Sequence, residues 1–452
     1  MKTIDRSVIA GLMERERATF RRRHRRSGTL AEEAKASLLY GVPMNWMTRW
    51  PGDFPVFVDR AEGARFWDVD GNEFVDLCLG DTGGMAGHAP KESAHAIAEQ
   101  AAKGITLMLP VEDAAWVGRE MTRRFGLPLW QFCLTATDAN RFVLRWAREM
   151  TGRPKIVVHN WNYHGTVDES FARLGSDGST IESEGNVGPP VDVGLTTKVV
   201  EINDLEGLER ALEPGDVAAC LFEPALTNIG IVLPEDGYHE GVRELCTRHG
   251  TLLVIDETHT ISAGPGGATR AWGLRPDFLT IGKTLGAGIP SAAYGVTAEV
   301  ATRLYEKTDW QHADVGGIGG TLAGNALSMA AMRATLGRVL TDEAFDRMIE
   351  LGGRFEEGVR SVIVSHELPW HVVRIGCRVE YLFRPDRARN GEEAHAGQDP
   401  ELDALIHLYL LNRGVLITPF HNMALMSPAT TPEDVDRHTE VFSQATDELI
   451  GG

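Results

Sequence analysis

The chain has 452 residues, of which 43% are hydrophobic and 24% charged, a balance typical of a soluble globular protein with two or three domains. Its formal net charge of -19 argues against nucleic acid as the main partner, and no apolar stretch is long enough to cross a bilayer. Five dispersed cysteines without paired spacing indicate reduced thiols in a cytoplasmic protein and give no metal-ligand pattern.

The N-terminal part of the chain is charged and helical in pattern. Residues 1–60 predict a helical segment that joins the smaller domain, and residues 40–43 (Tyr-Gly-Val-Pro) end the helical pattern. The basic run 21–26 is interpreted as a solvated helix face or an arm on an acidic partner subunit; nucleic-acid or membrane contact is the less favoured alternative. Residues 55–58 and 65–71 predict a hairpin with Asp70-Gly71 as its turn.

The middle of the chain, residues 61–335, alternates short apolar runs with helical stretches. The runs at 155–158, 218–222 and 251–255 predict strands covered on both faces, and residues 238–249 predict a helix between two of them. This α/β alternation predicts a large domain built on a mostly parallel sheet. Residues 336–452 predict a smaller α+β domain, with helices over 342–363 and from Pro432 and a strand over 378–383.

Two charged residues end predicted strands in this large domain. Asp256 ends the run 253–255, and Lys283 follows the apolar run 278–281 and Gly282. Ligand groups gather at the carboxyl ends of parallel strands, and lysine is rarely buried unpaired. A lysine with a lowered pKa can form a Schiff base, and a carboxylate can keep a pyridine nitrogen protonated. The pair therefore indicates pyridoxal phosphate (PLP) chemistry.

With these motifs in order, the chain resembles the class III (fold type I) PLP-dependent aminotransferases from about Phe54 to the C-terminus. The resemblance is closest to the branch that holds glutamate-1-semialdehyde aminomutase and the β-amino-acid and amine transaminases. It implies PLP as cofactor, Lys283 as the Schiff-base residue and Asp256 as the partner of the ring nitrogen. It also implies a homodimer with active sites shared between the subunits.

The segment 134–140 is similar to the phosphate loop of this family, which implies phosphate contacts from Thr135, Ala136 and Thr137. Leu134 and Ala136 depart from the family pattern. Near the ring, Thr258 replaces the usual valine. His259 replaces glutamine or methionine, either to bond the phenolic oxygen of the cofactor or as a buried core histidine.

Further segments match the family in chain order. The resemblance implies that Tyr163 packs on the cofactor ring and that Glu223 supports the site from behind. It implies that Gly320 and Thr321 reach the phosphate of the neighbouring subunit, and that Gly87-His88 lies near the substrate entrance. Tyr163 as a plain core residue is the alternative.

The expected substrate is an apolar or aromatic primary amine, with a keto acid such as pyruvate as acceptor. The apolar side chains at the expected pocket favour this reading; they are Trp46, Met47, Trp50, Phe420 and Met423. Arg49 is the candidate partner of the keto-acid carboxylate and Arg378 a second one, because arginine binds carboxylates in a bidentate manner. These apolar residues can equally be core.

Several alternatives stay open at this point. A β-amino-acid aminotransferase or a glutamate-1-semialdehyde-type aminomutase would use the same catalytic residues. A silent binding protein on this fold is disfavoured by the intact Lys283 and Asp256. A dinucleotide-binding oxidoreductase is disfavoured because the glycine-rich segments 80–84 and 264–267 do not fit G-x-G-x-x-G.

Overall fold

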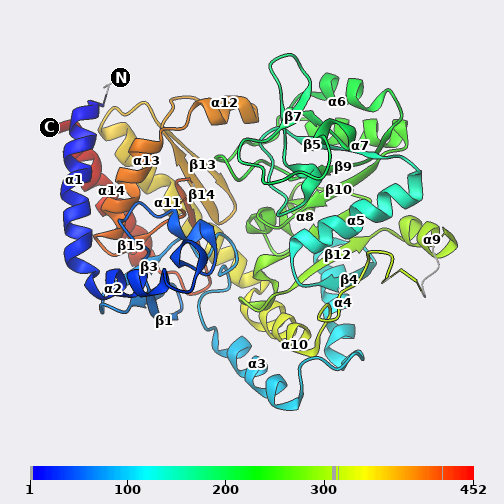
Figure 1. Ribbon diagram of the computed structural model, residues 1–452, viewed down its shortest axis with the longest axis horizontal. Coiled ribbons are helices and arrows are strands. Elements are labelled where there is room, and N and C mark those ends of the chain that lie inside the picture. The colour runs from blue at the N-terminus through cyan, green and yellow to red at the C-terminus, as the bar shows by residue number, and fades with distance from the viewer. Residues whose placement is uncertain (1–3, 308–311, 314, 420, 452) are drawn as a thin grey trace. The chain divides into compact units, whose positions relative to one another are not determined.

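The computed structural model describes residues 4–307, 312–313, 315–419 and 421–451 (Figure 1). Within these residues a seven-stranded sheet has the order β4 (Leu129–Cys133), β12 (Ala292–Val296), β11 (Phe278–Ile281), β10 (Leu252–Asp256), β9 (Val217–Phe222), β5 (Lys155–His159) and β8 (Thr197–Val200). Strand β12 runs antiparallel to both neighbours, and every other neighbouring pair is parallel. The predicted α/β fold with a mostly parallel sheet is confirmed.

Helices cover both faces of this sheet. Successive residues of β5 alternate between two buried clusters: Ile156 and Val158 join one and Val157 the other. Helices α5 (Ala136–Thr151) and α9 (Ala298–Lys307) contribute to the first cluster, and α6 (Leu205–Leu212) and α7 (Tyr238–His249) to the second. Strands β9 and β10 are buried throughout, as their continuous apolar sequences predict.

This unit also contains shorter strands, turns and further helices. They are α3 (Lys91–Lys103), α4 (Glu112–Phe125), η3 (Asp168–Ser170), β6 (Ala172–Leu174), β7 (Thr180–Glu182), η4 (Val193–Leu195), η5 (Thr260–Ala263), α8 (Gly267–Ala271), η6 (Lys283–Gly286), α10 (Ala326–Ala334), the π-helical turn η7 (Thr335–Val339) and α12 (Gly391–Ala396). Residues 91–342 and 388–396 form this unit.

A second unit comprises Met1–Pro90, Glu343–Arg387 and Gly397–Gly452. It holds a sheet of β1 (Val58–Glu62), β2 (Arg65–Asp68), β3 (Glu73–Asp76) and β15 (Val415–Leu416), and a sheet of β13 (His371–Ile375), β14 (Arg378–Leu382) and β16 (Met423–Leu425). Its helices are α1 (Arg6–Arg23), α2 (Arg25–Ala34), η1 (Leu39–Gly41), η2 (Asn45–Thr48), α11 (Asp342–Ser365), α13 (Pro400–Leu411) and α14 (Pro432–Gly451).

The segment 61–90 falls in this unit and not, as predicted from the sequence, in the large domain. The physical reason is that β3 pairs in parallel with β15, close to the C-terminus. The predicted hairpin also differs in its turn. Strands β1 and β2 are joined at Gly63, which has a φ of 60°, and Asp70-Gly71 instead joins β2 to β3.

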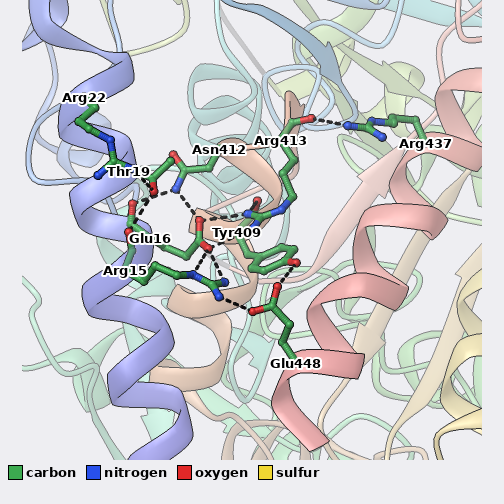
Figure 2. Close-up of polar contacts among 9 residues, drawn as sticks. All are labelled: Arg15, Glu16, Thr19, Arg22, Tyr409, Asn412, Arg413, Arg437 and Glu448. Carbon is green, nitrogen blue, oxygen red and sulfur yellow. Dashed lines mark hydrogen bonds and ion pairs between the residues drawn. The ribbon is translucent and has the colours of Figure 1, made fainter. Parts of the chain in front are cut away.

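Helix α1 is bonded to the C-terminal helices through a buried carboxylate (Figure 2). Glu16 is 1% exposed and accepts hydrogen bonds from Asn412 Nδ2 at 2.8 Å and Arg413 Nη1 at 3.0 Å. Arg15 Nη2 donates to its other oxygen at 2.7 Å. Burial opposes ionisation, but the hydrogen bonds from Arg413, Asn412 and Arg15 hold the pKa of Glu16 below its usual range.

The basic run 21–26 lies at the junction of α1 and α2. Its arginines are exposed, as expected for a solvated helix face, and Arg21 forms an ion pair with Asp53 at 2.5 Å. His24 is buried instead, with Nδ1 2.9 Å from Asp68 Oδ2. The five cysteines are buried free thiols, and no described helix has the length and apolar character needed to cross a membrane.

Candidate active site

The predicted site residues of the sheet unit follow the ends of its parallel strands. Asp256 ends β10 and is in register with Thr280 of β11, which is followed by Gly282 and Lys283. Glu223 follows β9, and the segment with His164 follows β5. The carboxyl ends of parallel strands share one edge of the sheet, so the topology brings these groups together.

Asp256 lies in a buried hydrogen-bond network. Its Oδ2 lies 2.9 Å from His164 Nδ1 and accepts a 2.9 Å hydrogen bond from Asn140 Nδ2; its Oδ1 accepts from the Thr258 amide at 3.1 Å. Burial alone would raise the pKa of Asp256, but the hydrogen bond and charge of His164, with Thr258 and Asn140, lower it to about 2. The carboxylate is therefore ionised although it is buried.

Asn140 fixes the far side of this network. It lies in α5, is fully buried, and its Oδ1 accepts a 2.6 Å hydrogen bond from Thr280 Oγ1. That bond orients the amide so that its NH₂ group faces Asp256. The sequence did not indicate a role for Asn140 or His164, because their contacts with Asp256 span 116 and 92 residues.

Lys283 lies at the start of η6 in a left-handed backbone conformation, with a φ of 55°. Such a conformation is unfavourable for a residue with a side chain and recurs at functional sites. The preceding Gly282 packs against the start of α5, where a Cβ would lie 2.9 Å from the Ala136 nitrogen. Glycine thus lets the backbone before Lys283 approach the predicted phosphate loop.

The ε-amino group of Lys283 contacts a second buried chain of polar groups. Its Nζ lies 2.5 Å from His259 Nε2, and His259 Nδ1 lies 2.8 Å from Thr227 Oγ1. Thr227 Oγ1 donates to Glu223 Oε2 at 2.5 Å. Burial raises the pKa of Glu223 to about 7, against smaller opposite effects of His164 and Thr227. His259 is therefore bonded to other site residues and is not an isolated core histidine.

The predicted phosphate loop forms the N-terminus of α5. Thr135 caps the helix by accepting from the Asp138 amide at 3.1 Å, and Asp138 in turn accepts from the Thr135 amide. Thr137 Oγ1 accepts from the Thr166 amide at 3.1 Å. The first amides of a helix have no intrahelical acceptor, so those of Ala136 and Thr137 are oriented to bind an anion.

Other predicted site residues lie around this cluster. Tyr163 follows β5, is 43% exposed, and its backbone amide interacts with the Glu223 carboxylate. The Thr258 hydroxyl is buried and has no hydrogen-bond partner among the described residues. Gly320 and Thr321 lie in an exposed turn before α10.

The predicted substrate residues belong to the other unit. Trp46 lies in η2, is 44% exposed, and its ring centroid is 6.4 Å from that of Trp50; Arg49 follows η2. Arg378 in β14 is fully buried and lies 3.4 Å from Asp81 and from Thr82. Phe420 lies outside the described residues.

Comparison with known proteins identifies the family. The sequence model of the family Aminotransferase class-III matches residues 46–446. This chain belongs to that family. The class-III enzyme is similar to a solved glutamate-1-semialdehyde aminomutase from Pseudomonas aeruginosa PAO1, at 50% identity, 99% coverage of both chains and a TM-score of 0.96.

Two further relatives of the class-III enzyme are an aminomutase and an aminotransferase. Glutamate-1-semialdehyde 2,1-aminomutase of Methanothrix thermoacetophila is 33% identical over 92% of this chain and 95% of its own. A β-phenylalanine aminotransferase from Variovorax paradoxus is 25% identical, with 96% and 97% coverage and a TM-score of 0.84.

The class-III enzyme is PLP-dependent. When bound, PLP supplies an electron sink for chemistry at the carbon next to an amine. The residues present fit this group. Asp256 is a buried carboxylate that stays ionised, which suits a protonated ring nitrogen. The unpartnered Thr258 hydroxyl beside it offers a further polar contact, and Lys283 Nζ lies at the same strand ends.

Proposed function

We propose that this class-III enzyme is an aminomutase that moves an amino group between neighbouring carbons of one small amino-aldehyde, with glutamate-1-semialdehyde as the model substrate. The observation that carries the proposal is the 50% identity over 99% of the chain to the Pseudomonas protein of that name. The relative from Methanothrix adds support. These relatives favour the aminomutase alternative over the transaminase of apolar amines that the sequence analysis preferred.

The predicted catalytic and cofactor-binding residues have roles in this proposal. Lys283 holds the cofactor and moves the substrate proton, and Asp256 pairs with the ring nitrogen. Thr135, Ala136 and Thr137 bind the phosphate, and the start of α5 supports this role. Side chains around the ring complete the site: Tyr163, Glu223, Thr258 and His259.

We propose that two copies of the chain form a homodimer in which Gly320 and Thr321 serve the partner's phosphate site. An exposed apolar segment supports this. Within residues 105–109, Met108 is 77% and Leu109 75% exposed, and the Ala326 amide donates to the Ile105 carbonyl, next to the turn with Thr321. Exposed apolar patches mark interfaces.

Light scattering should give the mass of a dimer, and Met108→Asp should give monomers with weaker PLP retention. A wild-type monomer would refute the dimer.

A transaminase that takes an apolar or aromatic amine and pyruvate is the second candidate. The neighbouring rings of the exposed Trp46 and the partly buried Trp50 favour it, since aromatic side chains suit an apolar substrate. Arg49 is the proposed partner of the keto-acid carboxylate, and Phe420 a proposed pocket residue. If this candidate is correct, Trp46→Ala should lower the activity toward an aromatic amine more than the activity toward a small one.

One experiment separates the two candidates. The PLP-loaded enzyme is given glutamate-1-semialdehyde without any other amine or keto acid, and Lys283→Ala serves as the inactive control. The proposal predicts the isomer with its amino group moved to the former aldehyde carbon. No isomer, together with alanine formation from 1-phenylethylamine and pyruvate, would establish the second candidate instead. Neither product would refute both.

A further inference from the structure

A continuous line of hydrogen bonds joins Lys283 to the buried carboxyl group of Glu223. The line runs from Lys283 Nζ through His259 and Thr227 Oγ1 to Glu223 Oε2, with steps of 2.5, 2.8 and 2.5 Å. Glu223, Thr227 and His259 are 4%, 0% and 5% exposed. Three strand ends supply these groups, because Glu223 and Thr227 follow β9, His259 follows β10 and Lys283 follows β11.

This line can carry its protons in two arrangements. In the first, the Lys283 ammonium donates to His259 Nε2, His259 Nδ1–H donates to Thr227, and the Thr227 hydroxyl donates to the Glu223 carboxylate. In the second, the acid form of Glu223 donates to Thr227, Thr227 donates to His259 Nδ1, and His259 Nε2–H donates to a neutral Lys283 amine. The two arrangements hold the same number of protons and differ in which end of the line is protonated.

We infer that Glu223, Thr227 and His259 form a proton relay that stores on Glu223 the proton that Lys283 gives up. One N–H bond at Lys283 Nζ breaks and one O–H bond at Glu223 Oε2 forms, while His259 and Thr227 each accept one proton and release another. The relay returns Lys283 to the neutral amine that proton transfer requires. The inference rests on the proposed role of Lys283, but not on the identity of the substrate.

The surroundings of Glu223 suit proton storage. Burial raises the pKa of Glu223 to about 7, so the group can hold or release a proton near neutral pH. Thr227 and the backbone amide of Tyr163 favour the ionised carboxylate, but burial outweighs both, so the neutral acid persists up to about pH 7.

Other titratable groups near the relay are engaged elsewhere. His164 after β5 and Asp256 at the end of β10 bond each other at 2.9 Å, and both act on Glu223 through their charge. Glu257, next to Asp256, accepts hydrogen bonds from the amides of Ala268 and Thr269. Glu223 is therefore the carboxyl group at the end of this line of bonds.

The first test uses the holoenzyme without substrate and follows the visible absorption of PLP bound to Lys283 as the pH is varied. Thr227→Val keeps the shape but removes the hydroxyl, so His259 is no longer held as an acceptor toward a protonated Nζ. The midpoint of the absorption change should fall by about one pH unit, the size expected for a lost hydrogen bond to a charged group. Thr227→Ser should restore it.

Thr284→Val is the matched control, because Thr284 adjoins Lys283, is equally buried, and its hydroxyl has no partner among the described residues. Its midpoint should equal that of the wild type. An unchanged midpoint in Thr227→Val, or equal shifts in the valine and serine variants, would overturn the relay.

A second test reads the stored proton directly and does not depend on the Thr227 variants folding. Difference infrared spectra of the holoenzyme should show a protonated carboxyl band that appears as the pH falls through about 7. Asp403 also has a pKa raised to about 7, so the spectra are recorded in an Asp403→Asn background. In that background Glu223→Gln should lack the band, and a band that persists would overturn the inference. Neither test uses a substrate, so failure of the aminomutase assay would leave both results interpretable.

Discussion

Replacing His164 with leucine tests how the buried Asp256 carboxylate is kept charged. His164 is fully buried, and its Nδ1 lies 2.9 Å from Asp256 Oδ2. Burial alone would raise the pKa of Asp256, and His164 makes the largest of the opposing contributions that lower it to about 2. A hydrogen bond to a charged group is worth about 1.5–3 kcal/mol, or one to two pH units. We expect the pKa of Asp256 to rise to about 4 in His164→Leu.

The sign of the stability change follows from the lowered pKa. The stabilising contribution of the Asp256 carboxylate is complete above its usual pKa of 3.8 and is lost as the pH falls through about 2. Without His164 most of that contribution disappears at neutral pH as well. The free energy of unfolding at pH 7 should therefore fall by about 2 kcal/mol.

The assay combines urea unfolding at pH 7 with the retention of PLP between pH 2 and pH 8. In His164→Leu the acid limit of retention should move up by one to two pH units. His164→Asn is the control, because its side-chain amide can donate where Nδ1 does, and it should stay closer to the wild type. If the leucine variant has the same acid limit of PLP retention and the same unfolding free energy as the wild type, the reasoning is refuted.

Two stability predictions concern the other unit. Burial raises the pKa of Asp403 from its usual value of 3.8 to about 7. Ionisation of this carboxyl group should therefore lower the free energy of unfolding by an amount that grows between pH 3.8 and about pH 7. Urea unfolding should therefore show Asp403→Asn gaining stability relative to the wild type over that range; a difference independent of pH would contradict this. Glu16→Leu removes the buried carboxylate that two arginines and an amide share (Figure 2) and should lower the unfolding free energy by about 2 kcal/mol. Glu14→Leu, exposed on the same helix, should change it by less than about 0.5 kcal/mol. Equal losses in the two leucine variants would show that the buried contacts are not the cause.

The elements that depend on local pattern could be predicted from the sequence. The continuous apolar runs of β9 and β10 gave buried strands, and the final helix begins at Pro432 as predicted. The placement of Asp256 and Lys283 at strand ends follows from the same runs, because a parallel sheet brings its strand ends to one edge.

Contacts between distant segments could not be predicted in this way. Nothing in the local sequence around Asn140 or His164 indicates that both bond Asp256, because side-chain packing decides those contacts. The insertion of β12 between β4 and β11 depends on strand order, which periodicity does not encode. The hairpin turn was misplaced because Asp70-Gly71 is a good turn sequence, and it does form a turn, but between β2 and β3.

The most direct test of the account is to find where the protein holds its cofactor. The holoenzyme is reduced with borohydride, digested, and its cofactor-bearing peptide is identified by mass spectrometry. PLP should be found fixed on Lys283, and Lys283→Ala should bind PLP without fixing it. Cofactor fixed on a different lysine, or fixed equally in Lys283→Ala, would contradict the assignment on which the site and the relay are built.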